Sequence, residues 1–215
     1  METILDKTFL GESCRLYQFG VQIELALSRK IISLYYQLKL EIPLQWQVID
    51  IVPAYTSLAI YLAAASQLNQ DISPLDTLIT KLWSEADASA ITTATTHIIP
   101  TNYNGEDLES LADYHHLSIR QLIDYHCQPD YFIAMLGFKP YFPYLIGLNE
   151  RLVTPRRDNP RLNVAAGSVA IGGRQTGIYT ANSPGGWHII GHTEFRDFQL
   201  FRPGDLIRFH ESKLC

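Results

Sequence analysis

The sequence predicts a two-domain protein, in which an α+β, ferredoxin-like domain (residues 1–90) precedes a mainly-β barrel domain (residues 91–215). Three observations lead to this prediction. The first half alternates pairs of strand patterns with amphipathic helices. The stretch 87–96 is small and polar and has no helical periodicity, as expected of a linker. The stretch 167–193 spaces seven glycines between short apolar runs. The length of 215 residues does not by itself distinguish one domain from two.

The first domain opens with two expected strands, 2–10 and 13–19, joined at Gly11. A helix is expected over 23–39, because apolar residues recur there at spacings of three and four: Ile23, Leu27, Ile31, Leu34 and Leu38. Pro43 prevents this helix from continuing, since proline lacks an amide donor and clashes with the preceding turn.

Two more strands are expected at 46–52 and 57–63, followed by a second helix. We expect Ser73 to cap this helix and Pro74 to occupy its first position. The order strand, strand, helix, repeated once, is typical of an α+β sandwich with both helices on one face of the sheet.

The second domain begins near His97 with two short helices, the latter opened by Ser118 and Gln121 at capping-box spacing. After Phe132 the pattern is strand and turn. Pro203 and Gly204 fit the centre of a type II turn before a last strand at 206–210.

The glycine-rich stretch is best explained as curved sheet, because glycine inside a strand pattern marks a bulge or a close approach of backbone. Curved sheet with many short strands indicates a small barrel. Arg174, Gln175 and Thr176 are then candidates for a binding face. A phosphate-binding P-loop is disfavoured, because Gly173 and Arg174 stand where that motif needs Lys and Ser or Thr.

Composition excludes several classes of function. A formal net charge of −5 and 18% charged residues leave no basic stripe for nucleic acid. No stretch has the roughly 20 apolar residues of a membrane helix, and no signal peptide is apparent. The three cysteines are far apart and in no CxxC spacing, so we expect a reduced, cytoplasmic protein.

No metal site is expected from the seven histidines. His188 and His192 would face one ion only on a helix, and the surrounding glycines favour a strand, where this spacing separates them by roughly 13 Å. His115 and His116 are adjacent and diverge on a helix. No Ser/His/Asp or Cys/His set has a diagnostic motif, so the catalytic residues stay unassigned.

The candidates for a ligand or partner pocket combine guanidinium, amide, hydroxyl and aromatic groups. Arg156 and Arg157 follow Pro155 and would grip a carboxylate or phosphate, unless they form surface ion pairs. Gln175 and Thr176 offer polar groups where backbone approaches closely, unless they only satisfy their own turn. Aromatic candidates, with core packing as the alternative, complete the set, which is Pro140, Phe142, Arg156, Arg157, Gln175, Thr176 and Trp187.

Several motifs, in order, resemble the KipI family, which includes the B subunit of 5-oxoprolinase and the allophanate hydrolase subunit 1 domain. These are DIVPAYTSL at 50–58, GEDLE at 105–109, MLGFKPYFPYL at 135–145, LNERLVTPRR at 148–157, GSVAIGGRQTGIY at 167–179 and SPGGWHIIGHT at 183–193. The resemblance covers about 11–209. It implies that the barrel domain is cyclophilin-like. The chain departs from the family pattern at Tyr141, Pro143 and Ile146, where relatives have small residues, and bulkier groups there would narrow a pocket mouth.

The resemblance implies two functions from different classes. The first is the B subunit of an ATP-dependent 5-oxoprolinase, which converts 5-oxoproline to L-glutamate. It would be inactive alone and would work with a larger partner that resembles the C subunit of that enzyme. A third protein, resembling the A subunit, would complete the complex, and ATP would be bound by the complex. The alternative is a regulatory protein that inhibits a sensor histidine kinase. A proline isomerase activity would rest on the barrel alone.

Overall fold

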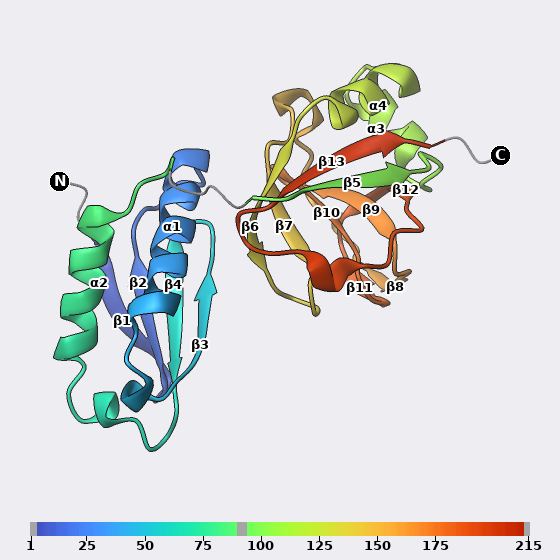
Figure 1. Cartoon of the computed structure of the whole chain (residues 1–215). Coiled ribbons are helices and arrows are strands. Elements are labelled where there is room, and N and C mark those ends of the chain that lie inside the picture. The colour runs from blue at the N-terminus through green and yellow to red at the C-terminus, as the bar shows by residue number, and fades with distance from the viewer. Residues whose placement is uncertain (1–3, 90–93, 213–215) are drawn as a thin grey trace. The chain divides into compact units, whose positions relative to one another are not determined.

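The computed structural model describes residues 4–89 and 94–212. The chain divides into two compact units, Met1–Thr93 and Ala94–Cys215 (Figure 1). The boundary expected between residues 90 and 91 falls within 90–93, outside the described residues.

The first unit is a four-stranded antiparallel sheet with two helices on one face (Figure 1). The strands pair in the order β1-β2-β4-β3. This agrees with the expected order of strands and helices. The elements are β1 (Asp6–Leu10), β2 (Cys14–Gln18), α1 (Leu25–Glu41), β3 (Val48–Pro53), β4 (Ser57–Leu62) and α2 (Ser73–Glu85), with 3₁₀ turns at Leu44–Trp46 and Gln67–Asn69.

Side chains alternate between the two faces of each strand, and those on the helix side form the core of this unit. Leu58, Ile60 and Leu62 of β4 point to the helices and are fully or almost fully buried. The expected cap of α2 is wrong in detail, because Ile72 occupies the N-cap position and Ser73 is already helical. The amide of Ser73 donates instead to the Asp71 carboxylate, at 2.9 Å.

The second unit holds nine strands among the described residues, in three hydrogen-bonded sheets of order β5-β13-β6-β7, β10-β9-β12 and β11-β8. Its strands are β5 (Thr96–Thr101), β6 (Tyr131–Leu136), β7 (Pro143–Ile146), β8 (Arg161–Val164), β9 (Ser168–Gly172), β10 (Gln175–Ile178), β11 (Ser183–Gly185), β12 (His188–His192) and β13 (Leu206–Glu211). Its helices are α3 (Leu108–Tyr114) and α4 (Ile119–Cys127), with 3₁₀ turns at Glu150–Leu152 and Phe198–Leu200.

The strands described in this unit do not close into one barrel, so the expected closure is wrong. Curvature is present, since β12 carries a bulge between Ile189 and Gly191. The ladders, however, stop at separate edges, and β11 is only three residues long. The second unit is therefore a mixed α/β arrangement with several sheets.

Local signals in the second unit are confirmed. Ser118 and Gln121 form a complete capping box at the start of α4. Asp205 donates its amide to the Arg202 carbonyl at 3.1 Å, and Gly204 has a φ of 97°, as a type II turn requires.

Among the described residues, no helix is long and apolar enough to cross a membrane. Cys14 and Cys127 carry free thiols, and Cys215 lies outside the described part of the chain.

Candidate functional site

A cavity of about 300 Å³ in the second unit is walled by aromatic rings, and we call it the aromatic cavity. Phe142 lines this cavity, with its ring centroid 5.4 Å from that of Tyr179 and 5.7 Å from that of Trp187. Both pairs meet edge to face, the arrangement that aromatic quadrupoles favour. Tyr144 completes the wall and Phe138 stands at the rim.

The glycine-rich stretch makes room for these rings. A Cβ atom at Gly172 would lie 2.4 Å from Trp187 Cδ1, and one at Gly185 would lie 2.1 Å from the Tyr179 hydroxyl. Only glycine permits such an approach of ring to backbone. The prediction that these glycines mark close packing is therefore confirmed.

Two arginines from the loop after the Glu150–Leu152 turn line the aromatic cavity. The Arg156 guanidinium carbon lies 5.8 Å from the centroid of the Trp187 ring, a cation–π distance. Among the described residues, no carboxylate lies within 4.0 Å of the Arg156 guanidinium. Arg156 is exposed and its charge is therefore available to an anion.

Arg157 forms an ion pair with Asp107, whose side chain is buried. Asp107 Oδ1 accepts from Arg157 Nη1 and from Arg161 Nη2, each at 2.8 Å, and Oδ2 accepts from the Ile189 amide at 2.7 Å. Burial raises the pKa of Asp107, but the bonds from Arg161 and Ile189 outweigh it and lower the pKa below its usual value. Asp107 therefore stays ionised and fixes the loop that carries Arg156.

A second cavity, of about 610 Å³, shares Arg156 and Arg157 with the first, and we call it the polar cavity. Its wall adds Ser110, Tyr114, Asp158, Asn159 and His188. Trp187 and His188 are successive residues, and they line different cavities as alternation at the start of a strand requires.

The two histidines next to this loop are engaged with it. His188 Nε2 lies 2.9 Å from the Pro155 carbonyl oxygen, so it donates there. His115 Nε2 lies 2.8 Å from the Thr154 hydroxyl, which itself donates to the Leu152 carbonyl. Burial and the neighbouring His188 lower the pKa of His115. As expected, His188 and His192 both lie on β12.

A buried polar chain explains Thr176. Its hydroxyl donates to the Ala170 carbonyl at 2.9 Å and so accepts from His126 Nε2 at 2.9 Å. His126 Nδ1 then accepts from the Tyr103 hydroxyl at 2.6 Å, and Tyr103 contacts the Cys127 thiol at 3.2 Å. Burial lowers the pKa of His126 to about 3, so the imidazole is neutral.

The structure brings four of the seven predicted site residues to the aromatic cavity. Phe142, Arg156, Arg157 and Trp187 all line it. The other three line neither cavity. Gln175 begins β10, Thr176 is buried in the polar chain, and Pro140 lies in an exposed loop whose carbonyl accepts from Thr180.

Sequence reasoning missed several residues of the site, among them Asp107, Phe138 and Tyr179. Asp107 occurs within the GEDLE segment, but its arginine partners are 50 and 54 residues away. Tyr179 ends the segment GSVAIGGRQTGIY, and its place in this glycine-rich motif was the available signal.

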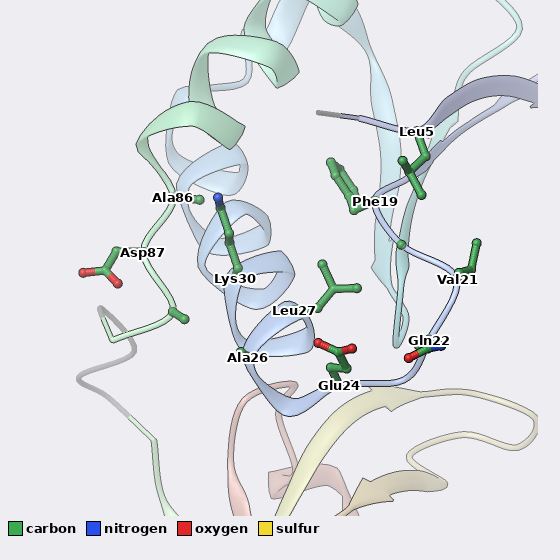
Figure 2. A pocket seen from close by; sticks show the side chains of 12 residues that line it. Leu5, Phe19, Val21, Gln22, Glu24, Ala26, Leu27, Lys30, Ala86 and Asp87 are labelled. Atoms are coloured by element: carbon green, nitrogen blue, oxygen red, sulfur yellow. The ribbon is translucent and has the colours of Figure 1, made fainter. Parts of the chain in front are cut away.

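A third hollow, of about 630 Å³, lies within the first unit between the segment before α1 and the end of α2 (Figure 2). Figure 2 shows mostly aliphatic and short side chains around it, including Leu5, Val21 and Leu27. Its cation, Lys30, lies over the Trp83 ring at 4.3 Å. We centre the candidate site on the aromatic cavity, because aromatic walls and an available guanidinium converge there.

Comparison with known proteins decides the family. The profile of the carboxyltransferase domain, subdomains C and D, matches residues 6–205. This chain belongs to that carboxyltransferase family. It is 35% identical over 216 residues to the B subunit of 5-oxoprolinase from Escherichia coli O157:H7, covering 95% of this chain and 94% of that one. It is also 43% identical over 150 residues to the B subunit of 5-oxoprolinase from Haemophilus influenzae, covering 65% of this chain and 70% of the relative.

Solved structures similar to this chain include larger proteins. The crystal structure of TTHA0988 superposes with a TM-score of 0.79 at 30% identity, covering 94% of this chain and 40% of that chain. This chain therefore spans about two fifths of TTHA0988.

Proposed function

We propose that this chain is the B subunit of an ATP-dependent 5-oxoprolinase, in which it supplies part of the site that binds 5-oxoproline. The observation that carries the proposal is the match to the E. coli 5-oxoprolinase protein along 95% of the chain. A second match of the same name comes from Bacillus subtilis, at 43% identity over 121 residues. These names favour the enzyme component over an inhibitor of a sensor kinase.

The chemistry of the aromatic cavity suits this substrate. 5-Oxoproline is a small five-membered lactam with one carboxylate. Its ring methylenes pack against aromatic faces such as Phe142 and Trp187, and a cavity of about 300 Å³ is at the small end of ligand pockets. Its carboxylate pairs with the Arg156 guanidinium, which forks onto a carboxylate in a geometry that lysine does not offer.

The residues of this chain bind and orient, and the reaction is completed elsewhere in the complex. Opening the lactam adds one water molecule across the amide bond, and hydrolysis of ATP to ADP and phosphate drives it. We propose that ATP is handled by the complex, which contains a larger partner and a third protein. The several sheets of the second unit would then serve as a scaffold for the aromatic cavity.

The test is reconstitution with the larger partner and the third protein, followed by assays of glutamate and ADP release from 5-oxoproline. We expect turnover to need all three proteins. Undiminished turnover when this chain is omitted would refute the proposed role.

A further inference from the structure

The rim of the aromatic cavity differs from its wall in burial. Phe142 and Trp187 are 2% and 5% exposed, whereas Phe138 is 59% exposed although it lines the same cavity. The Phe138 and Phe142 rings meet edge to face, with centroids 5.6 Å apart and planes at 83°. Phe138 thus contacts the wall through one edge-to-face pair and leaves much of its surface exposed at the cavity mouth.

The backbone of the loop, together with the contact to Phe142, holds Phe138 in this place. Three backbone hydrogen bonds close the loop between β6 and β7. The Gly137 amide donates to the Phe142 carbonyl at 3.1 Å, the Lys139 amide to the Gly137 carbonyl at 2.7 Å, and the Phe142 amide to the Lys139 carbonyl at 3.0 Å. Phe138 has a φ of 63°, in the left-handed region that residues with a Cβ seldom occupy. Residues with a side chain held in this region cost free energy and cluster at functional sites.

Tyr141 provides an internal comparison. It lies in the same loop, also has a φ of 63°, and is 45% exposed. It does not line the aromatic cavity. The two residues therefore share backbone geometry and exposure, and they differ in access to the cavity.

We propose that Phe138 determines the ring size that the aromatic cavity accepts, by covering the exposed face of a bound five-membered lactam. This inference rests on the proposed function and extends it from a substrate to a selectivity element. The buried rings of Phe142 and Trp187 limit how deeply a ligand enters the cavity, and Phe138 limits the size of the cavity opening. A ring with one more methylene would clash with the Phe138 side chain. It would therefore lose the favourable contact with Phe138 that the five-membered ring makes.

The experiment compares two substrates in the reconstituted complex. 5-Oxoproline and its six-membered homologue, 6-oxopiperidine-2-carboxylate, differ by one methylene and share the lactam and the carboxylate. One methylene in a fitted pocket changes kcat/KM by about 10-fold or more. In a Phe138→Ala complex we expect the preference for the smaller ring to fall about 10-fold, with a higher KM and an unchanged kcat for 5-oxoproline.

Tyr141→Ala is the matched control, and its preference should equal that of the wild type. Phe138→Tyr keeps the ring and should keep the preference. An unchanged preference in Phe138→Ala, or an equal loss in Tyr141→Ala, overturns the proposal.

Size-exclusion chromatography of each complex separates the remaining outcomes. If Phe138→Ala prevents assembly, Phe138 is a partner contact and the proposal is wrong. If wild-type turnover does not need this chain, the proposed function fails and the selectivity role fails with it. A wild-type complex that needs the chain, with no effect of Phe138→Ala, refutes only the selectivity role.

Discussion

Replacing Asp107 by Asn should destabilise the second unit, because this buried carboxylate is the anion shared by two arginines. It accepts three hydrogen bonds, two from guanidinium groups and one from the Ile189 amide. Hydrogen bonds to charged groups contribute roughly 1.5–3 kcal/mol each, and breaking a buried pair costs roughly 3–5 kcal/mol. The side chains of Arg157 and Arg161 are 33% and 17% exposed, so water recovers part of that loss. We expect a loss of about 3 kcal/mol at pH 7.

The pH dependence of this loss follows from the lowered pKa of Asp107. A carboxyl whose folded pKa lies below its unfolded value, about 3.9, adds stability above that pH. The contribution disappears as pH falls through the folded pKa. The difference in free energy of unfolding between wild type and Asp107→Asn should therefore have its largest value at pH 7 and decrease below about pH 4.

Hydrogen exchange followed by mass spectrometry is the suitable assay, because it measures the opening free energy of each unit separately. Peptides from β9 and β12 should exchange faster in the variant, and those from α1 should not. Asp124→Asn is the control, since Asp124 forms an exposed i,i+4 ion pair with Arg120 and should change stability by under about 0.5 kcal/mol. The reasoning fails if Asp107→Asn matches this control at pH 7, or if its effect is the same at pH 7 and pH 3.

Three further predictions concern the site and its support. In the reconstituted complex, Arg156→Gln should raise the KM for 5-oxoproline by about 10-fold to 100-fold. Arg174→Gln, which alters an exposed ion pair outside both cavities, should leave this KM unchanged. Equal KM values for the two variants would contradict the contact between Arg156 and the substrate carboxylate. Gly172→Ala should place a Cβ against Trp187 and lower the free energy of unfolding by about 1–3 kcal/mol. The near-ultraviolet circular dichroism signal should change as well. An unaltered spectrum and melting curve would count against the close packing of Gly172 and Trp187. The folded pKa of His126 is about 3, so just below pH 6.5 only the unfolded chain protonates this imidazole. Between pH 7.5 and pH 5, the free energy of unfolding of the wild type should therefore fall by about 2 kcal/mol more than that of His126→Gln in denaturant titrations. Parallel pH profiles of the two proteins would exclude this account.

Elements with strong local signals were predictable. The apolar stripe of α1 and the capping box at Ser118 depend on residues within one or two turns of each other. The structure confirms the capping box and the stripe from Leu27 to Leu38. Ile23, the expected first residue of the stripe, lies before the helix and is 49% exposed. Strand β5 was missed, because Pro100 interrupts its pattern. Proline is tolerated there because β5 is an edge strand, paired only with β13 in its sheet.

Part of the site was predictable for a similar reason. Arg156, Arg157 and Trp187 stand out as unusual residue types in short motifs, and they do share a cavity. The roles of Asp107 and Thr176 depend on partners about 50 residues away, at Arg157 and at His126. No local pattern encodes such pairings. Closure of a barrel likewise depends on strand partners, whereas glycine spacing reports only local curvature and close packing.

The position of β13 has a consequence for synthesis on the ribosome. Leu206–Glu211 runs parallel to β5, more than 100 residues earlier in the chain, and also pairs with β6 (Figure 1). Its sheet therefore lacks an inner strand until translation reaches these codons. The first unit contains all four strands of its own sheet before residue 63 and can fold while translation continues. A nascent chain paused before β13 would expose the unpaired edges of β5 and β6, which is when the protein is most open to aggregation and to chaperones.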